Sequence, residues 1–149
     1  AEDKAYGLTE YTRALLSRHI SGRLKLAPEH TEDHVLRAMR KPGFSSFEAF
    51  LKDFRAYCKK KDLPWQLVPY FISAHPGCTE RDMHELSKKA GRLGLMTDQV
   101  QEFTPTPMTL STTMYYTGID PYSGKKIFSA RSEHQKKKQK SYFFRPGRK

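Results

Sequence analysis

The chain has 149 residues and a formal net charge of +11 at pH 7. This length suits one domain of ordinary size. No apolar run approaches the ~20 residues that a membrane-spanning helix needs, and the first residues lack the basic-then-apolar pattern of a secretory signal. We therefore expect a cytoplasmic protein with no membrane partner.

The charge is unevenly distributed. Residues 125–149 hold ten Lys or Arg and one Glu, a net charge of +9, whereas residues 1–124 carry +2. A Lys-rich segment of this kind is most often a solvated helix face, and nucleic-acid contact is the alternative.

Cysteine content excludes two kinds of site. Cys58 and Cys78 are too few for a disulfide framework, and a [4Fe–4S] cluster needs three or four thiolates. We expect Cys58 to be a small buried hydrophobic side chain on a helix, and we expect this chain alone to hold no metal.

Apolar periodicity predicts the first elements. A helix over 8–19 is followed by a strand over 23–27, which Pro28-Glu29-His30 ends. Thr31 is the expected N-cap of a second helix over 32–40.

The next helix is the clearest element in the sequence. Ser45 and Glu48 have the spacing of a capping box, and the apolar residues that follow repeat at helical spacing: Phe47, Phe50, Leu51, Phe54, Tyr57 and Cys58. Residues 66–72 then form a mostly apolar run that is typical of a buried strand. Pro69 argues against a central position for that strand, because proline lacks an N–H donor.

A further helix and strand complete the pattern. Thr79 and Asp82 mark the start of a helix that runs to about Leu93, and residues 99–104 are the third expected strand. Strands joined by helices pair in parallel with right-handed crossovers. Three strands are few, and the first helix lacks a preceding strand, so the pattern indicates part of a larger α/β structure.

Beyond Thr104 the periodicity is lost. Residues 120–124 are a strong turn signal, and the many tyrosines nearby suggest a segment that packs on the rest of the protein. Residues 132–144 are expected to form a basic helix, and residues 145–149 to be disordered.

Polar residues gather where the expected strands end. The carboxyl ends of parallel strands share one edge, where ligands bind, and they deliver Pro28-Glu29-His30, then residues 73–77, then residues 104–107. Two alternatives to a ligand-binding role stay open. One is that Glu29 and His30 cap the following helix, and the other is that His75 holds its loop by hydrogen bonds.

Several of these segments resemble one family. The runs over 69–79, 99–107 and 109–121, together with Ser21-Gly22-x-Leu24-Lys25-x-Ala27-Pro28-Glu29-His30, are similar to the YgiQ family of radical S-adenosylmethionine (SAM) proteins. The resemblance covers roughly residues 8–144, and its motifs occur in a long, ordered set.

The resemblance implies a fold and a cofactor. Radical SAM domains are partial (β/α)6 barrels in which a CxxxCxxC loop binds a [4Fe–4S] cluster that reduces SAM. By this resemblance, residues 1–107 are the C-terminal half of a partial TIM-type barrel with parallel strands and helical crossovers. Residues 108–149 are then a largely irregular, basic C-terminal extension.

The resemblance also implies positions near SAM. Glu29, with His30 beside it, would face the ribose or amino group, and the segment containing Ser73, His75, Pro76 and Gly77 would lie along the adenine. Gln101 and residues from Phe103 to Pro105 would form the last edge near the adenine. Many such proteins have glycine where this chain has Ala74, so the backbone approach there is expected to be less close.

No CxxxCxxC motif occurs in the sequence. We therefore expect a piece of a radical SAM enzyme that is inactive alone, binds neither SAM nor a cluster by itself, and has the rest of the parent polypeptide as its partner. Its substrate stays unknown. The alternative is a small basic α/β module that binds nucleic acid through the tail, with Tyr142, Phe143 and Phe144 stacking on bases.

Overall fold

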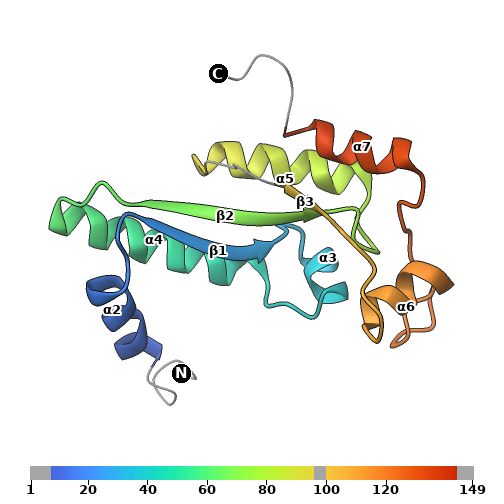
Figure 1. The fold of residues 1–149 in the computed structure, drawn as a ribbon, viewed down its shortest axis with the longest axis horizontal. Coiled ribbons are helices and arrows are strands. Elements are labelled where there is room, and N and C mark those ends of the chain that lie inside the picture. Colours follow the sequence, from blue (N-terminus) through green and yellow to red (C-terminus); the bar gives the residue numbers. More distant parts are fainter. Residues whose placement is uncertain (1–7, 96–99, 144–149) are drawn as a thin grey trace.

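The structure is a computed structural model that describes residues 8–95 and 100–143. Within these residues the chain has an α/β fold around an open, three-stranded parallel sheet in the order β1-β2-β3 (Figure 1). The strands are β1 (Arg23–Glu29), β2 (Gln66–Ser73) and β3 (Val100–Glu102). The α/β class and the parallel pairing expected from the sequence are therefore confirmed.

Helices connect the strands and cover one face of the sheet. Helix α2 (Leu8–Arg18) precedes β1, α3 (Asp33–Ala38) and α4 (Phe44–Lys61) lead to β2, and α5 (Glu80–Arg92) leads to β3. Leu67 and Phe71 of β2 share one apolar cluster with residues of both α4 and α5. Helices α4 and α5 are also adjacent, because Arg55 donates to the Leu93 carbonyl oxygen at 2.6 Å.

The spacing of apolar residues explains why α4 forms and packs. Its inward stripe is buried, and each fully buried large side chain contributes about 1.5–3 kcal/mol; the stripe consists of Phe44, Phe47, Leu51, Phe54 and Cys58. Asp62, in the left-handed conformation, ends the helix. The expectation that Cys58 is a buried helical residue is confirmed.

Two of the expected helix starts are wrong. Helix α3 is shorter than expected and its N-cap is Glu32, not Thr31, without a side-chain capping bond. Helix α4 begins before the expected capping box, with Gly43 as N-cap, and the Phe44 N–H donates instead to Asp33 Oδ1 at 3.1 Å. A carboxylate from α3, distant in sequence, thus replaces the local cap that the pattern favoured.

The Thr79–Asp82 capping box is present as expected. The Thr79 hydroxyl oxygen accepts from the Asp82 N–H at 3.3 Å, and Asp82 Oδ2 accepts from the Thr79 N–H at 2.8 Å. Two of the first orphan amides of α5 are therefore satisfied locally.

β2 is the central strand despite Pro69, which corrects the expectation from the sequence. Pro69 pairs with Leu26 of β1, whereas pairing with β3 begins only at Phe71 among the described residues. Among the described residues, Pro69 is therefore paired with β1, and none of the pairs between β2 and β3 involves its missing N–H.

The basic helix expected over 132–144 is confirmed, though it is shorter, and the described part of the segment after β3 holds one further helix. The two helices are α6 (Leu110–Thr117) and α7 (Glu133–Ser141), with α7 beside α5 (Figure 1). Thr109 caps α6, and Gly118 ends it in the left-handed conformation. The Ser- and Thr-rich composition of α6, with its low helix propensity, hid it from the periodicity. The turn over 120–124 is confirmed by the Gly124 N–H donating to the Asp120 carbonyl oxygen.

Two further expectations concern the C-terminus and the membrane. The C-terminal residues 145–149 lie outside the described part of the chain. None of the helices that the structure describes has the length and hydropathy needed to cross a bilayer.

Candidate functional site

Glu29 lies at the end of β1 in an unusual conformation. One extra residue of β1 is accommodated between Leu26 and Glu29, and Glu29 has a φ of 66°. A bulge of this kind redirects a side chain at a strand end. Glu29 Oε1 forms an ion pair with Lys41 Nζ at 3.2 Å, whereas the buried Oε2 has no hydrogen-bond partner.

His30 points into the protein interior. It is fully buried, its Nδ1 accepts from the Glu32 N–H at 3.0 Å, and its Nε2 lies 3.5 Å from Cys78 Sγ. Burial lowers the pKa of His30 to about 3, so the ring is neutral with its proton on Nε2. His30 therefore supports the start of α3, with both ring nitrogens in contact with groups of the protein interior.

The loop after β2 is held by contacts from β3 and from the segment before α7. The Ser73 hydroxyl donates to the Gln101 carbonyl oxygen at 3.3 Å, and Ala74 has a φ of 61°. Pro76, a residue of this loop, is buried. Gly77 has a φ of 88° and donates its N–H to the Phe128 carbonyl oxygen at 2.7 Å.

His75 has both ring nitrogens engaged within the protein. Nδ1 lies 2.8 Å from the Pro76 carbonyl oxygen, which can only accept, so Nδ1 carries the proton. Nε2 then accepts from the Ser111 hydroxyl at 2.8 Å. Burial lowers the pKa of His75 to about 4. The open alternative, that His75 holds its loop, is the one these contacts favour.

The end of β3 completes the edge. Gln101 is exposed and pairs in register with Ile72, and the Phe103 N–H donates to the Ser73 carbonyl oxygen at 2.8 Å. The Phe103 ring meets the His75 ring at 5.0 Å, edge to face. Pro105 is half-buried just beyond.

The three strand ends therefore meet at one edge, as parallel pairing requires. Four of the expected residues form a contiguous group there: Ser73, His75, Gln101 and Phe103. Glu29 pairs with Phe71, two residues before Ser73, so it borders this group.

Three residues of this edge gave no signal in the sequence. They are Lys41, which pairs with Glu29, Ser111, which contacts His75, and Gln139, whose Oε1 accepts from the Ala74 N–H at 2.8 Å. Each lies far along the chain from its partner or inside a polar run, where periodicity carries no information on contacts.

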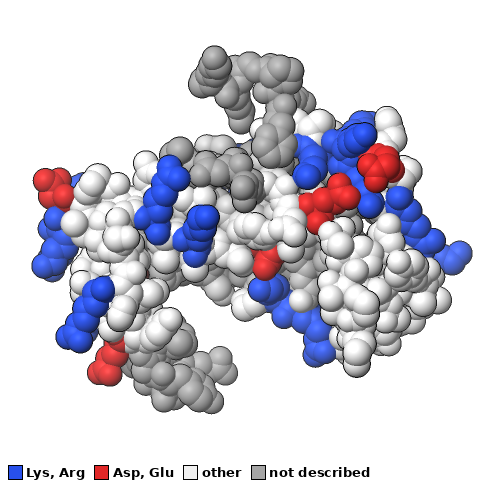
Figure 2. All heavy atoms as spheres, in the orientation of Figure 1, with Lys and Arg blue, Asp and Glu red and all other residues white. Residues whose placement is uncertain are grey.

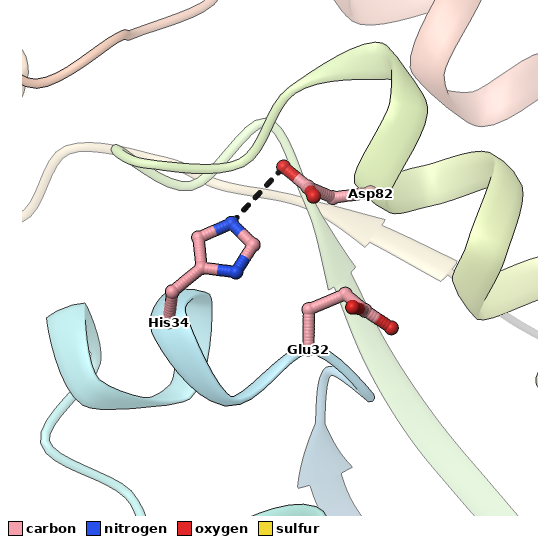
Figure 3. Close-up of side chains that lie close together, drawn as sticks. All are labelled: Glu32, His34 and Asp82. Carbon is pink, nitrogen blue, oxygen red and sulfur yellow. Dashed lines mark ion pairs between the residues drawn. The ribbon is translucent and has the colours of Figure 1, made fainter.

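A second polar cluster lies beneath this edge. One ligand-type atom each from Glu32, His34 and Asp82 lies within 4.8 Å of the others. Asp82 Oδ2, however, already accepts from the Thr79 N–H and hydroxyl and lies 3.3 Å from His34 Nε2. Figure 3 shows the Glu32 carboxylate directed away from the His34 ring. Capping of α5 accounts for Asp82, and Glu32 Oε1 accepts from the Thr31 hydroxyl at 3.2 Å.

The cysteines are not suited to bind a cluster. Cys58 and Cys78 are both buried, and burial raises the pKa of each thiol. Metal ligation needs the thiolate, which such surroundings disfavour. Cys78 instead takes part in the hydrogen bonds around His30 and Gln139.

Comparison with known proteins gives related sequences. The chain is 52% identical over 135 residues to a UPF0313 protein of Bacteroides thetaiotaomicron, covering 91% of this chain and 22% of that protein. It is 50% identical to one of Porphyromonas gingivalis (91% and 21%) and 48% identical to one of Methanosarcina mazei (89% and 21%). The chain belongs to the UPF0313, or YgiQ, family.

The chain spans about a fifth of the length of these YgiQ-family relatives. Residues 98–145 match the model of a domain of unknown function, DUF3362, and the matches together are consistent with a C-terminal portion. No solved structure matches the chain. The DUF3362 match includes β3, α6 and α7, and so both Ser111 and Gln139.

The basic part of this YgiQ-family chain is partly neutralised. Figure 2 shows acidic side chains among the Lys and Arg side chains over α7. Lys136 pairs with Glu102 at 3.1 Å, and Lys138 with Glu80 at 2.9 Å. The Tyr142 hydroxyl donates to Glu80, and the Phe143 ring packs on Phe71.

These contacts remove part of the argument for nucleic-acid binding. Tyr142 and Phe143 are half-buried against the α/β core, so they present no open pair of rings for bases. Phe144 lies outside the described residues. Binding through the remaining charge stays a prediction.

Proposed function

We propose that this chain supplies the SAM-facing strand ends of a radical SAM enzyme. Residues 1–107 are the later half of its partial barrel, and residues 108–149 are an extension that packs on it. The parent polypeptide supplies the cluster, and this chain alone is inactive.

The open face of the sheet supports a barrel. Helices α4 and α5 cover the face that carries Leu67 and Phe71. Alternation along the strands puts Lys25, Val68, Tyr70 and Gln101 on the opposite face. There Lys25 and Gln101 are exposed, Tyr70 is half-buried and Val68 is buried. Doubly wound sheets have helices on both faces, whereas barrels leave one face to line the interior.

Glu29 carries the proposal that SAM binds at this edge. A buried carboxylate oxygen without a donor is costly, and Glu29 Oε2 is one, on a residue held at a φ of 66°. SAM offers an ammonium group and two ribose hydroxyls, all of which donate hydrogen bonds. Strained residues and unsatisfied polar groups concentrate at functional sites.

The chain fits SAM but not the cluster. Glu29 would accept a hydrogen bond from SAM, Gln101 would lie at its border, and Phe103 would offer an apolar surface for the adenine. Bound at this edge, SAM would supply radical hydrogen-abstraction chemistry, with the cluster held by the rest of the parent polypeptide. Cys58 and Cys78 are both buried, and burial raises the pKa of each thiol, so they do not fit as cluster ligands. Within the parent polypeptide, the role of this chain would be to orient SAM.

The test is a binding titration on the complete gene product that contains these residues. S-adenosylhomocysteine is the probe, because it keeps the ammonium and ribose groups and is not consumed. Glu29→Gln replaces the unsatisfied acceptor by an amide and should weaken binding by roughly tenfold or more, about 1.4 kcal/mol. Lys41→Met is the control for the lost ion pair and should weaken binding less.

Equal affinity in wild type and E29Q, at equal thermal midpoints, would contradict the proposal. The sequence upstream of Ala1 gives an independent check. A CxxxCxxC motif there supports the cluster assignment, and a complete gene product without one would overturn it.

A further inference from the structure

Ala74 has a backbone conformation that its side chain does not favour. Its φ of 61° lies in the left-handed region, where residues with a Cβ are rare. Such a residue persists only when its surroundings hold it. Ala74 is also buried, at 1% exposure, so its N–H needs a partner inside the protein.

The partner comes from α7, in the C-terminal extension. Gln139 Oε1 accepts from the Ala74 N–H at 2.8 Å, and Gln139 Nε2 donates to the Cys78 carbonyl oxygen at 2.9 Å. One side-chain amide thus bridges two backbone groups of the same loop. Gln139 is 2% exposed, so no solvent competes for these bonds.

The rest of α7 is arranged to present this amide. Gln139 is the buried residue of the helix, whose remaining residues are polar. Two lysines of α7 form ion pairs with the α/β part. Lys136 pairs with Glu102 at the end of β3, and Lys138 pairs with Glu80 at the start of α5. These ion pairs hold α7 across the strand ends, with Gln139 over the loop.

The same amide is linked to the end of β1. Cys78 Sγ donates to Gln139 Oε1 at 3.4 Å, and His30 Nε2 lies 3.5 Å from the same sulfur. His30 follows Glu29 directly. The buried chain His30–Cys78–Gln139–Ala74 therefore joins the ends of β1 and β2 to the extension.

We infer that Gln139 is a positioning residue, which holds the loop 73–78 in its left-handed turn and so makes the C-terminal extension part of the SAM-binding edge. The identity of the ligand in this inference rests on the proposed function, whereas the role of Gln139 in holding the loop does not. Holding the loop gives the extension a role in shaping the site.

The test is Gln139→Leu in the complete gene product, with two measurements. Hydrogen exchange at the Ala74 amide should accelerate by roughly tenfold or more, because the bond that protects it is lost. Affinity for S-adenosylhomocysteine should fall by a similar factor, roughly tenfold. Lys137→Leu, an exposed position on the same helix, is the matched control and should change neither.

A second pair of variants separates positioning from simple loss of packing. Glycine adopts positive φ without the Cβ penalty, so Ala74→Gly should depend less on Gln139. In the A74G background, Q139L should cost clearly less affinity than in the wild-type background. Gln139→Glu keeps the acceptor for Ala74 and loses the donor to Cys78, and should fall between wild type and Q139L.

The outcomes distinguish the two proposals. Wild-type protein that fails to bind S-adenosylhomocysteine would contradict the proposed function, while exchange at Ala74 would still test the loop contact. Unchanged exchange at Ala74 in Q139L would overturn the positioning role, as would an equal loss of affinity with and without A74G.

Discussion

The α/β part and the C-terminal extension are held together in different ways. Residues of α4, α5 and β2 form one continuous apolar cluster, whereas the buried apolar residues described in 108–143 are Met114 and Ala130. The extension is instead attached largely by polar contacts from Gln139, Ser111 and Lys136, besides the Tyr142 and Phe143 rings that pack on the core. The apolar core therefore determines stability, and the extension determines how the strand ends are positioned.

The largest expected effect is in the core. Phe71 is fully buried between the strands and the helices, so Phe71→Ala should lower the free energy of unfolding by about 3–5 kcal/mol. Chemical denaturation measures this change. Phe128→Ala, at an exposed position of the extension, is the control. A comparable loss of stability in that variant would contradict the statement that the apolar core determines stability.

Acid should destabilise the polar contacts next. The pKa of His30 is lowered to about 3 and that of His75 to about 4, in each case chiefly by burial. Unfolded histidine titrates near 6.5. Below that pH the unfolded state binds more protons than the folded state, so stability falls as pH falls from 6.5 toward 4. The two histidines together should cost about 2–3 kcal/mol between pH 7 and pH 5.5.

Denaturant titrations at the two pH values measure this loss. His75→Gln should remove about half of it, and His84→Gln, at a half-exposed site, is the control. A loss that is the same in H75Q and wild type would show that His75 is not a buried neutral histidine.

A smaller effect is expected within the extension. Arg131 Nη2 donates to the carbonyl oxygens of Tyr115 and Tyr116 at 2.7 and 2.9 Å, at the end of α6. Arg131→Ala should cost only about 1 kcal/mol, because the side chain is exposed. Hydrogen exchange should accelerate in α6 and not in α4. Faster exchange throughout the core would contradict a local role.

The smallest expected effect concerns nucleic acid. With Lys136 and Lys138 paired and Tyr142 and Phe143 packed, we expect weak, charge-driven binding of single-stranded RNA that disappears as salt rises. Fluorescence anisotropy at several salt concentrations measures it. Tight binding at low salt that falls steeply as salt rises and is lost when the basic tail is deleted would favour the nucleic-acid module instead.

The sequence predicted the regular part of the fold well. The helical spacing of Phe47 to Cys58 and the capping box at Thr79 are local patterns, and both correspond to observed elements. The start of α4 was missed because its cap is Asp33, eleven residues away. Pro69 led to a wrong expectation about the position of β2, because the residues of a strand do not show which strands it pairs with.

The sequence predicted the location of the site better than the role of each residue in it. Parallel strands must end at one edge, so Glu29, Ser73 and His75 were expected together, whereas Gln101 was placed there by the family resemblance. That His30 and His75 are turned inward follows from contacts with Glu32, Cys78 and Ser111. Gln139 was not predictable, because a glutamine in a Lys-rich helix has no pattern that distinguishes burial from exposure.

The most direct test of the central claim is the hydrogen-exchange footprint of S-adenosylhomocysteine on the complete gene product. Protection is expected at the carboxyl ends of the strands, over residues 27–30, 73–77 and 101–105. No protection is expected at the opposite ends, over 21–24 and 64–67. Protection confined to those opposite ends, or absent from all three carboxyl ends, would contradict the account.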